Sequence, residues 1–108
     1  MEDQLNTLFD PAGVAVIGAS ANPGKLSHSV VRNLKEHGYK GAIYPVNPKG
    51  GLILELPVYT NIRAVPDPVD LAIIMVNAHI VPAALNQCGE RGLKTVIVIS
   101  GGFKETGP

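Results

Sequence analysis

The sequence predicts an α/β fold with a doubly wound, mainly parallel sheet and helices on both of its faces. Short runs of consecutive apolar residues alternate along the chain with segments of helical periodicity. Consecutive rather than alternating apolar residues are typical of parallel strands that are buried on both faces. The chain has 108 residues, 45% of them hydrophobic and 17% charged, which suits one hydrophobic core. We therefore expect a single domain over residues 1–108.

The first half of the chain predicts a strand, a helix and a second strand. Apolar runs predict the strands at 13–18 and 42–46. Between them, Ser27 is a candidate N-cap and Gly38 a candidate stop signal for a helix over 27–37. The apolar positions of this helix recur at helical spacing, and they are Val30, Val31 and Leu34.

The segment 52–68 is the least regular part of the chain. Its prolines limit it to a short strand around Val58 and one helical turn near 61–64. The segment can therefore supply only a short crossover between the second strand and the strand that follows it.

The last part of the chain predicts strands at 71–76 and 95–99, with a helix between them that ends near Gly92. Right-handed crossovers then give a sheet in which the predicted strands, numbered along the chain, are ordered 3-2-1-4-5. A ligand of such a sheet is expected across the carboxyl ends of the strands. The apolar stripe of this helix consists of Val81, Ala84, Leu85 and Cys88. Cys88 is expected to be a core residue rather than a nucleophile.

The turn after the first strand is the clearest functional signal in the sequence. Residues 18–25 are mostly small and a helix follows them, so free backbone N–H groups and the helix dipole favour a phosphate there. The turn differs from a Walker A loop, because five residues separate Gly18 from Gly24. Leu26 also follows Lys25, at the position where a Walker A loop has Ser or Thr.

A dinucleotide site fits the same turn poorly. Counting from Gly18, two glycines of the dinucleotide fingerprint are replaced by Ser20 and Pro23. The second strand is followed by Lys49, where an NAD site has an acid for the ribose hydroxyls. A cation there suits an adenosine that carries an extra ribose phosphate. The residues by themselves therefore leave both CoA and NADP as candidate ligands.

Composition and charge exclude several classes of function. The formal net charge is zero and no basic run is present, which argues against nucleic acid as a partner. No apolar stretch approaches the roughly twenty residues of a membrane span. A single cysteine cannot form an internal disulfide, so we expect a cytoplasmic protein. The three histidines lack metal-ligand spacing, and we assign no catalytic and no metal-binding residue.

Six segments in a fixed order carry a resemblance to a known family. They are 8–11 (LFDP), 14–20 (VAVIGAS), 24–25 (GK), 44–49 (YPVNPK), 70–74 (DLAII) and 101–107 (GGFKETG). With these segments, which are distributed over essentially the whole chain, the sequence resembles the N-terminal CoA-binding domain of NDP-forming acyl-CoA synthetases. This group includes the ADP-forming acetyl-CoA synthetases and, more distantly, the succinyl-CoA synthetase α subunit. The resemblance implies a Rossmann-like fold and coenzyme A as the ligand.

The resemblance also implies a role for each candidate residue. The residues around the CoA phosphates would be Gly18, Ser20, Ala21, Asn22, Pro23, Gly24 and Lys25. The residues at the adenosine end would be Val46, Pro48 and Lys49, with Lys49 as the cation for the ribose phosphate. The residues along the pantetheine would be Val76, Asn77, Ala78, Ser100, Gly101 and Gly102.

The family reaction, as the resemblance implies it, converts acyl-CoA, NDP and phosphate into acid, CoA and NTP through an acyl phosphate and a phosphohistidine. The phosphohistidine and the nucleotide site belong to further domains or subunits, so we expect this chain to hold CoA without catalysing the reaction alone. The domain of the family continues past the Gly-Gly-Phe turn, whereas this chain stops at Pro108, which suggests a C-terminal truncation. The alternatives are a stand-alone, non-enzymatic CoA-binding regulator and an NADP-binding oxidoreductase domain.

Overall fold

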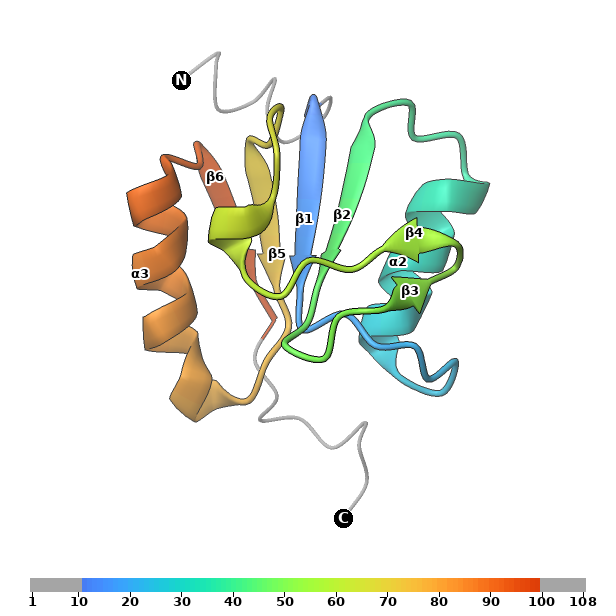
Figure 1. Ribbon diagram of the computed structural model, residues 1–108, viewed down its shortest axis with the longest axis horizontal. Helices are drawn as coiled ribbons and strands as arrows, with labels where there is room; N and C mark the ends of the chain where they lie inside the picture. Colours follow the sequence, from blue (N-terminus) through green and yellow to red (C-terminus); the bar gives the residue numbers. More distant parts are fainter. Residues whose placement is uncertain (1–10, 100–108) are drawn as a thin grey trace.

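Four parallel strands form the central sheet, in the order β2-β1-β5-β6. The computed structural model describes residues 11–99. Within them the strands are β1 (Gly13–Ile17), β2 (Ala42–Val46), β5 (Leu71–Ile74) and β6 (Thr95–Val98). All four point in the same direction, so their carboxyl ends lie at one edge of the sheet (Figure 1). The predicted fold class and these four strands are confirmed, with strand ends that differ by at most two residues from the prediction.

Two helices, α2 (Leu26–Glu36) and α3 (Val81–Arg91), cover opposite faces of the sheet. Because alternate residues of a strand face opposite sides, the strands contribute to two separate halves of the core. The half under α2 includes Val14, Val16, Ala19, Val31, Ile53 and Leu71. The half under α3 includes Ala15, Ile17, Ala72, Ile74, Ala84 and Cys88. No helix within residues 11–99 is long and apolar enough to cross a bilayer.

The start of α2 differs from the sequence prediction. Ser27, the predicted N-cap, is buried inside the helix, and the N-cap position is Lys25. The reason is that the carbonyl of Lys25 already accepts hydrogen bonds from the backbone N–H groups of His28 (3.1 Å) and Ser29 (3.2 Å). The helix therefore begins before Ser27. Its predicted stop is confirmed, since Gly38 follows the helix with a φ of 83°.

One member of the predicted apolar stripe of α3 is exposed. Ala84 and Cys88 are buried, one helical turn apart, whereas Leu85 is 42% exposed. Leu85 lies one residue, or about 100°, around the helix from Ala84, which places it on the flank and not against the sheet. The predicted end of the helix is confirmed, because Gly92 takes a left-handed conformation at the C-cap.

The predicted short strand around Val58 is present as the two-residue strand β4 (Leu56–Pro57) and, beside β2, as a single bridge. Tyr59 forms an isolated parallel bridge with Val46. The N–H of Tyr59 donates to the carbonyl of Pro45 (2.9 Å), and the N–H of Asn47 donates to the carbonyl of Tyr59 (2.9 Å). The predicted order 3-2-1-4-5 is therefore confirmed for four strands, and at the outer position beside β2 it holds only for the single bridge at Tyr59. The chain turns away from the sheet into η1 (Ile62–Ala64) soon after the bridge.

The residues just before this bridge form an antiparallel hairpin of β3 (Leu52–Ile53) and β4 (Leu56–Pro57). Its two turn residues, Leu54 and Glu55, have φ values of 51° and 71°. Two positive φ values in a two-residue turn are the mark of a type I′ hairpin. The Nζ of Lys35 in α2 donates to the carbonyl of Leu54 (2.6 Å), which holds the hairpin against this helix.

Candidate functional site

The candidate site lies where β1, β2 and β5 end and their loops gather (Figure 1). Its first element is the turn at Gly18, which has a φ of 93° that favours glycine. A Cβ at Gly18 would overlap the carbonyl oxygen of Met75, just after β5. It would also come close to the side chain of Val76. Glycine is therefore needed both for the turn and for the close approach of the third loop to the first.

Local hydrogen bonds fix the loop between Gly18 and α2. The Oγ of Ser20 accepts from the N–H of Asn22 (3.0 Å), and the Oδ1 of Asn22 accepts from the N–H of Gly24 (2.9 Å). The carbonyl of Asn22 accepts from the N–H of Lys25 (3.0 Å). These short polar side chains thus stabilise their own turns, and residues 21–25 remain exposed.

The loop and the start of α2 present unused donors. No acceptor within residues 11–99 bonds the backbone N–H of Ala21 or of Leu26. The first turn of α2 contains no acidic side chain, and Lys25 makes no side-chain cap. Open N–H groups at the positive end of a helix, with no anion of their own, are suited to a phosphate.

Asn47 joins the second loop to the first. Its Nδ2 donates to the carbonyl of Ala19 (2.8 Å), while its Oδ1 accepts from the N–H of Lys49 (2.8 Å). Its backbone carbonyl accepts from the N–H of Gly50 (2.9 Å). One side chain therefore sets both the shape of the second loop and its distance from the first.

The structure brings the predicted phosphate and adenosine residues onto one edge. Val46 is buried, and its carbonyl accepts from the N–H of Gly18 (2.9 Å). Pro48 and Lys49 are exposed on the second loop, and Lys25 is exposed at the start of α2. Two lysines flanking open N–H groups give this edge a positive local field that favours anions.

The third predicted segment follows β5. The N–H of Met75 donates to the carbonyl of Ile17 (2.8 Å), which keeps the chain beside β1 up to Val76. Asn77 and Ala78 are exposed, and Asn77 is the N-cap of η2 (Ala78–Ile80). The remaining predicted residues, Ser100, Gly101 and Gly102, lie outside the described residues.

Two side chains of this edge were not among the predicted site residues. One is Asn47, whose signal is an Asn directly after a strand, beside a proline and a lysine. The other is His28 on the first turn of α2, which is only 6% exposed. Its Nδ1 lies 2.9 Å from the carbonyl oxygen of Ser20. Its signal is weaker, because a histidine on a helix face gives no indication of what it contacts.

The groups with shifted pKa values lie in the core and not at this edge. Burial raises the pKa of the Cys88 thiol, in agreement with a core role. Burial also raises the pKa of Tyr44, with a smaller contribution from Tyr59, whose ring packs edge-on at 5.8 Å between centroids. Within residues 11–99, no group of three or more His, Cys, Asp or Glu side chains could hold a metal ion.

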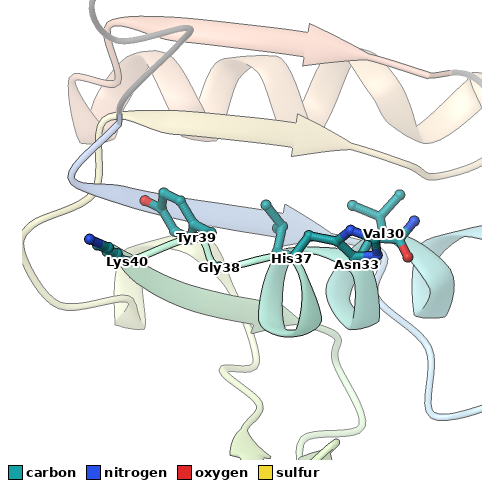
Figure 2. A pocket seen from close by; sticks show the side chains of 7 residues that line it. Val30, Asn33, His37, Gly38, Tyr39 and Lys40 are labelled. Carbon is teal, nitrogen blue, oxygen red and sulfur yellow. The ribbon is translucent and has the colours of Figure 1, made fainter.

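A pocket of about 530 Å³ lies away from the loops, along the second half of α2 and the turn after it. Figure 2 shows its lining side chains on α2 and on the turn that follows this helix. The lining consists of Val30, Asn33, Leu34, His37, Gly38, Tyr39 and Lys40. Because the candidate loops meet at the opposite end of α2, this pocket is separate from the candidate site.

Comparison with known proteins gives a family match and close relatives. Residues 12–106 match the family model described as a CoA binding domain. The chain is 50% identical over 107 residues to acetate–CoA ligase [ADP-forming] I subunit alpha of Pyrococcus furiosus, with coverage of 95% of this chain and 23% of that protein. It is also 50% identical over 103 residues to acetate–CoA ligase [ADP-forming] II of Archaeoglobus fulgidus, with coverage of 95% and 15%.

A solved structure shares the fold over the same region. It is the dinucleotide forming acetyl-coenzyme A synthetase 1 of Ca. Korarchaeum cryptofilum in complex with phosphate and ADP. The TM-score is 0.86 at 42% sequence identity, with coverage of 95% of this chain and 22% of the other. The chain thus spans less than a quarter of the length of each of these three proteins.

Proposed function

This chain belongs to the CoA-binding domain family, and from that premise we propose that the loops at the carboxyl edge of its sheet hold coenzyme A. The pyrophosphate lies on the loop from Ser20 to Lys25 and on the open N–H groups beside it. The ribose phosphate lies next to Lys49. The pantetheine runs along Val76, Asn77 and Ala78, and past Ser100 to Gly102.

The observation that carries this proposal is the link made by Asn47. CoA carries a pyrophosphate at the 5′ position of its ribose and a single phosphate at the 3′ position, so a site for it needs two anion-binding elements at a fixed separation. The hydrogen bond from Asn47 Nδ2 to the carbonyl of Ala19 (2.8 Å) sets that separation. The bond from the Lys49 N–H to Asn47 Oδ1 (2.8 Å) fixes the backbone that carries the lysine.

CoA fits this edge better than NADP does. In a dinucleotide site the second fingerprint glycine lets the backbone approach the pyrophosphate closely, and the third allows close helix packing; Ser20 and Pro23 occupy these two positions here. Both ligands carry a phosphate on the adenosine ribose, at the 3′ position in CoA and at the 2′ position in NADP, so a cation at Lys49 suits both. Discrimination between them therefore comes from the first loop.

We propose further that the chain acts as the CoA-holding module of a larger, cytoplasmic ADP-forming acyl-CoA synthetase. In that protein, other domains or subunits carry the nucleotide site and the phosphorylated histidine. They convert acyl-CoA, NDP and phosphate into acid, CoA and NTP while this module keeps the CoA in place. The relatives that support this are 50% identical to the chain and carry it as a small part of their length.

The test is a calorimetric titration of the 108-residue chain with CoA, NADP, NAD and ATP. CoA is expected to bind most tightly. Binding of NADP with equal or greater affinity would overturn the CoA proposal. A chain that binds CoA and forms no thioester from acetate, CoA, magnesium and ATP or GTP fits the module. Turnover above that of Lys25→Ala would instead indicate a complete active site on this chain.

A further inference from the structure

We propose that His28 is a positioning residue for the phosphate loop: it holds the Ser20–Ala21 peptide so that the N–H of Ala21, and not the carbonyl of Ser20, faces the bound phosphate. The inference rests on the proposed CoA site and adds to it a residue that never touches the ligand. It is carried by the burial of His28 and by the geometry of one hydrogen bond.

The contact requires a proton on one particular ring nitrogen. Nδ1 of His28 lies 2.9 Å from the carbonyl oxygen of Ser20. A carbonyl oxygen can only accept, so Nδ1 carries the proton and donates it. His28 is only 6% exposed, and it is one of the three buried residues of α2, with Ser27 and Val31. The loop carbonyl is therefore drawn inward, toward the buried ring.

The direction of the carbonyl decides the direction of the next N–H. A trans peptide unit is planar, and its C=O and N–H bonds point in opposite directions. With the Ser20 carbonyl turned toward His28, the N–H of Ala21 points toward the exposed side of the loop. Ala21 is exposed, and its N–H has no acceptor within residues 11–99. The peptide thus offers a donor on the side where a phosphate would lie.

A rotation of this peptide would reverse the effect on a phosphate. The carbonyl oxygen would then point outward and repel the anion, and the donor would be lost. The next peptide is held by the bond from the Asn22 N–H to the Oγ of Ser20 (3.0 Å), which does not involve the Ser20 carbonyl. Within the described residues, the bond from His28 is the one that holds this carbonyl.

The side chain can be varied so that the donor and the bulk change separately. In His28→Asn, the amide Nδ2 is the same number of bonds from Cα as Nδ1 of histidine and keeps a donor in place. In His28→Leu, the bulk stays similar and the donor is lost. His28→Gln places its donor one bond too far from Cα. His37→Leu removes an exposed histidine at the other end of the helix and is the matched control.

The measurements are calorimetric CoA affinity, the amide NMR spectrum during CoA titration, and the thermal midpoint. CoA affinity is expected to fall about tenfold in His28→Leu, as for loss of one well-placed hydrogen bond, and less than about threefold in His28→Asn. His28→Gln is expected to resemble His28→Leu, and His37→Leu the wild type. The Ala21 amide signal is expected to move with CoA in the wild type and His28→Asn, and to stop moving in His28→Leu.

Three results would overturn the positioning role. One is wild-type affinity in His28→Leu. Another is an Ala21 amide that responds to CoA equally in all variants while the thermal midpoints fall, which would make His28 only a core residue. The third is a ring in which ¹⁵N NMR finds Nδ1 without its proton. That last measurement needs no CoA, so it tests the contact even if the wild type fails to bind CoA, a failure that would count against the proposed function.

Discussion

Replacing Lys49 with alanine tests whether this lysine binds the ribose phosphate specifically or only attracts anions in general. The Lys49 side chain is exposed, and its backbone N–H donates to Oδ1 of Asn47 (2.8 Å). Alanine keeps that N–H, so the loop keeps its shape and only the ammonium group and its methylene stem are lost. CoA carries the ribose phosphate and dephospho-CoA lacks it, so the variant should weaken binding of the first ligand much more than of the second.

The size of the effect follows from the exposure of the lysine. A charge-assisted hydrogen bond contributes about 1.5 to 3 kcal/mol where it is shielded from water. At an exposed position solvent screening reduces this to about 1 to 2 kcal/mol, or roughly a five- to thirtyfold loss of affinity for CoA. For dephospho-CoA we expect a loss below about 0.5 kcal/mol, because only the long-range field changes.

The assay is calorimetric titration of both ligands into the wild type and Lys49→Ala at two salt concentrations. Lys94→Ala, which removes another exposed lysine just before β6, is the control. The difference between the ligands should shrink as salt is added. Equal losses for both ligands in Lys49→Ala would refute the assignment of the ribose phosphate to this lysine. If Lys94→Ala had an equal effect, the effect of Lys49→Ala would be explained by the change in net charge alone.

Three further predictions concern the frame of the site and the core. Asn47→Asp keeps the acceptor for the N–H of Lys49 and places an oxygen against the carbonyl oxygen of Ala19. CoA affinity should therefore fall at least about tenfold, and urea unfolding should show a loss of stability near 1 to 3 kcal/mol. Unchanged CoA affinity would contradict the link between the loops. Gly18→Ala places a Cβ at a φ of 93° and against the carbonyl oxygen of Met75, so urea unfolding should show a loss of stability of about 2 to 4 kcal/mol. A loss under about 0.5 kcal/mol would show that the turn tolerates a Cβ. Burial raises the pKa of Cys88 above its ordinary value of 9.0, so the folded state holds the thiol proton more tightly than the unfolded state. The contribution of this thiol to stability is full below the unfolded pKa and is lost as the pH rises through the higher folded pKa. Urea unfolding of Cys88→Ala should therefore show a flatter decline of stability over that pH range than the wild type.

The sequence predicted those parts of the fold that depend on local pattern. The run from Val14 to Ile17 could only be a strand buried on both faces, and β1 has this character throughout. Gly38 and Gly92 ended the helices because both positions require a positive φ. The strand around Val58 could not be judged in the same way. Whether it pairs with β2 over several residues or over one depends on where the chain must turn toward η1, which is a tertiary constraint.

The candidate site shows the same division between local and tertiary information. The turn at Gly18 and the loop lysine Lys49 could be predicted, because the residue types and their place after strands carry the signal. The roles of Asn47 and His28 could not. Each acts through a hydrogen bond to a backbone carbonyl, of Ala19 and Ser20 respectively, and a carbonyl is present at every residue. Only the folded chain shows which one is in reach.

The bridge beside β2 has a consequence for self-association. An outer strand normally offers its backbone groups to any other chain, which is a common route to aggregation. On β2 the outward groups are few, since Pro45 has no N–H and its carbonyl is taken by Tyr59. On the other side, β6 (Thr95–Val98) pairs only with β5 within residues 11–99 and carries no proline or charge. Any strand-to-strand association of this chain should therefore begin at β6 and leave the β2 side untouched.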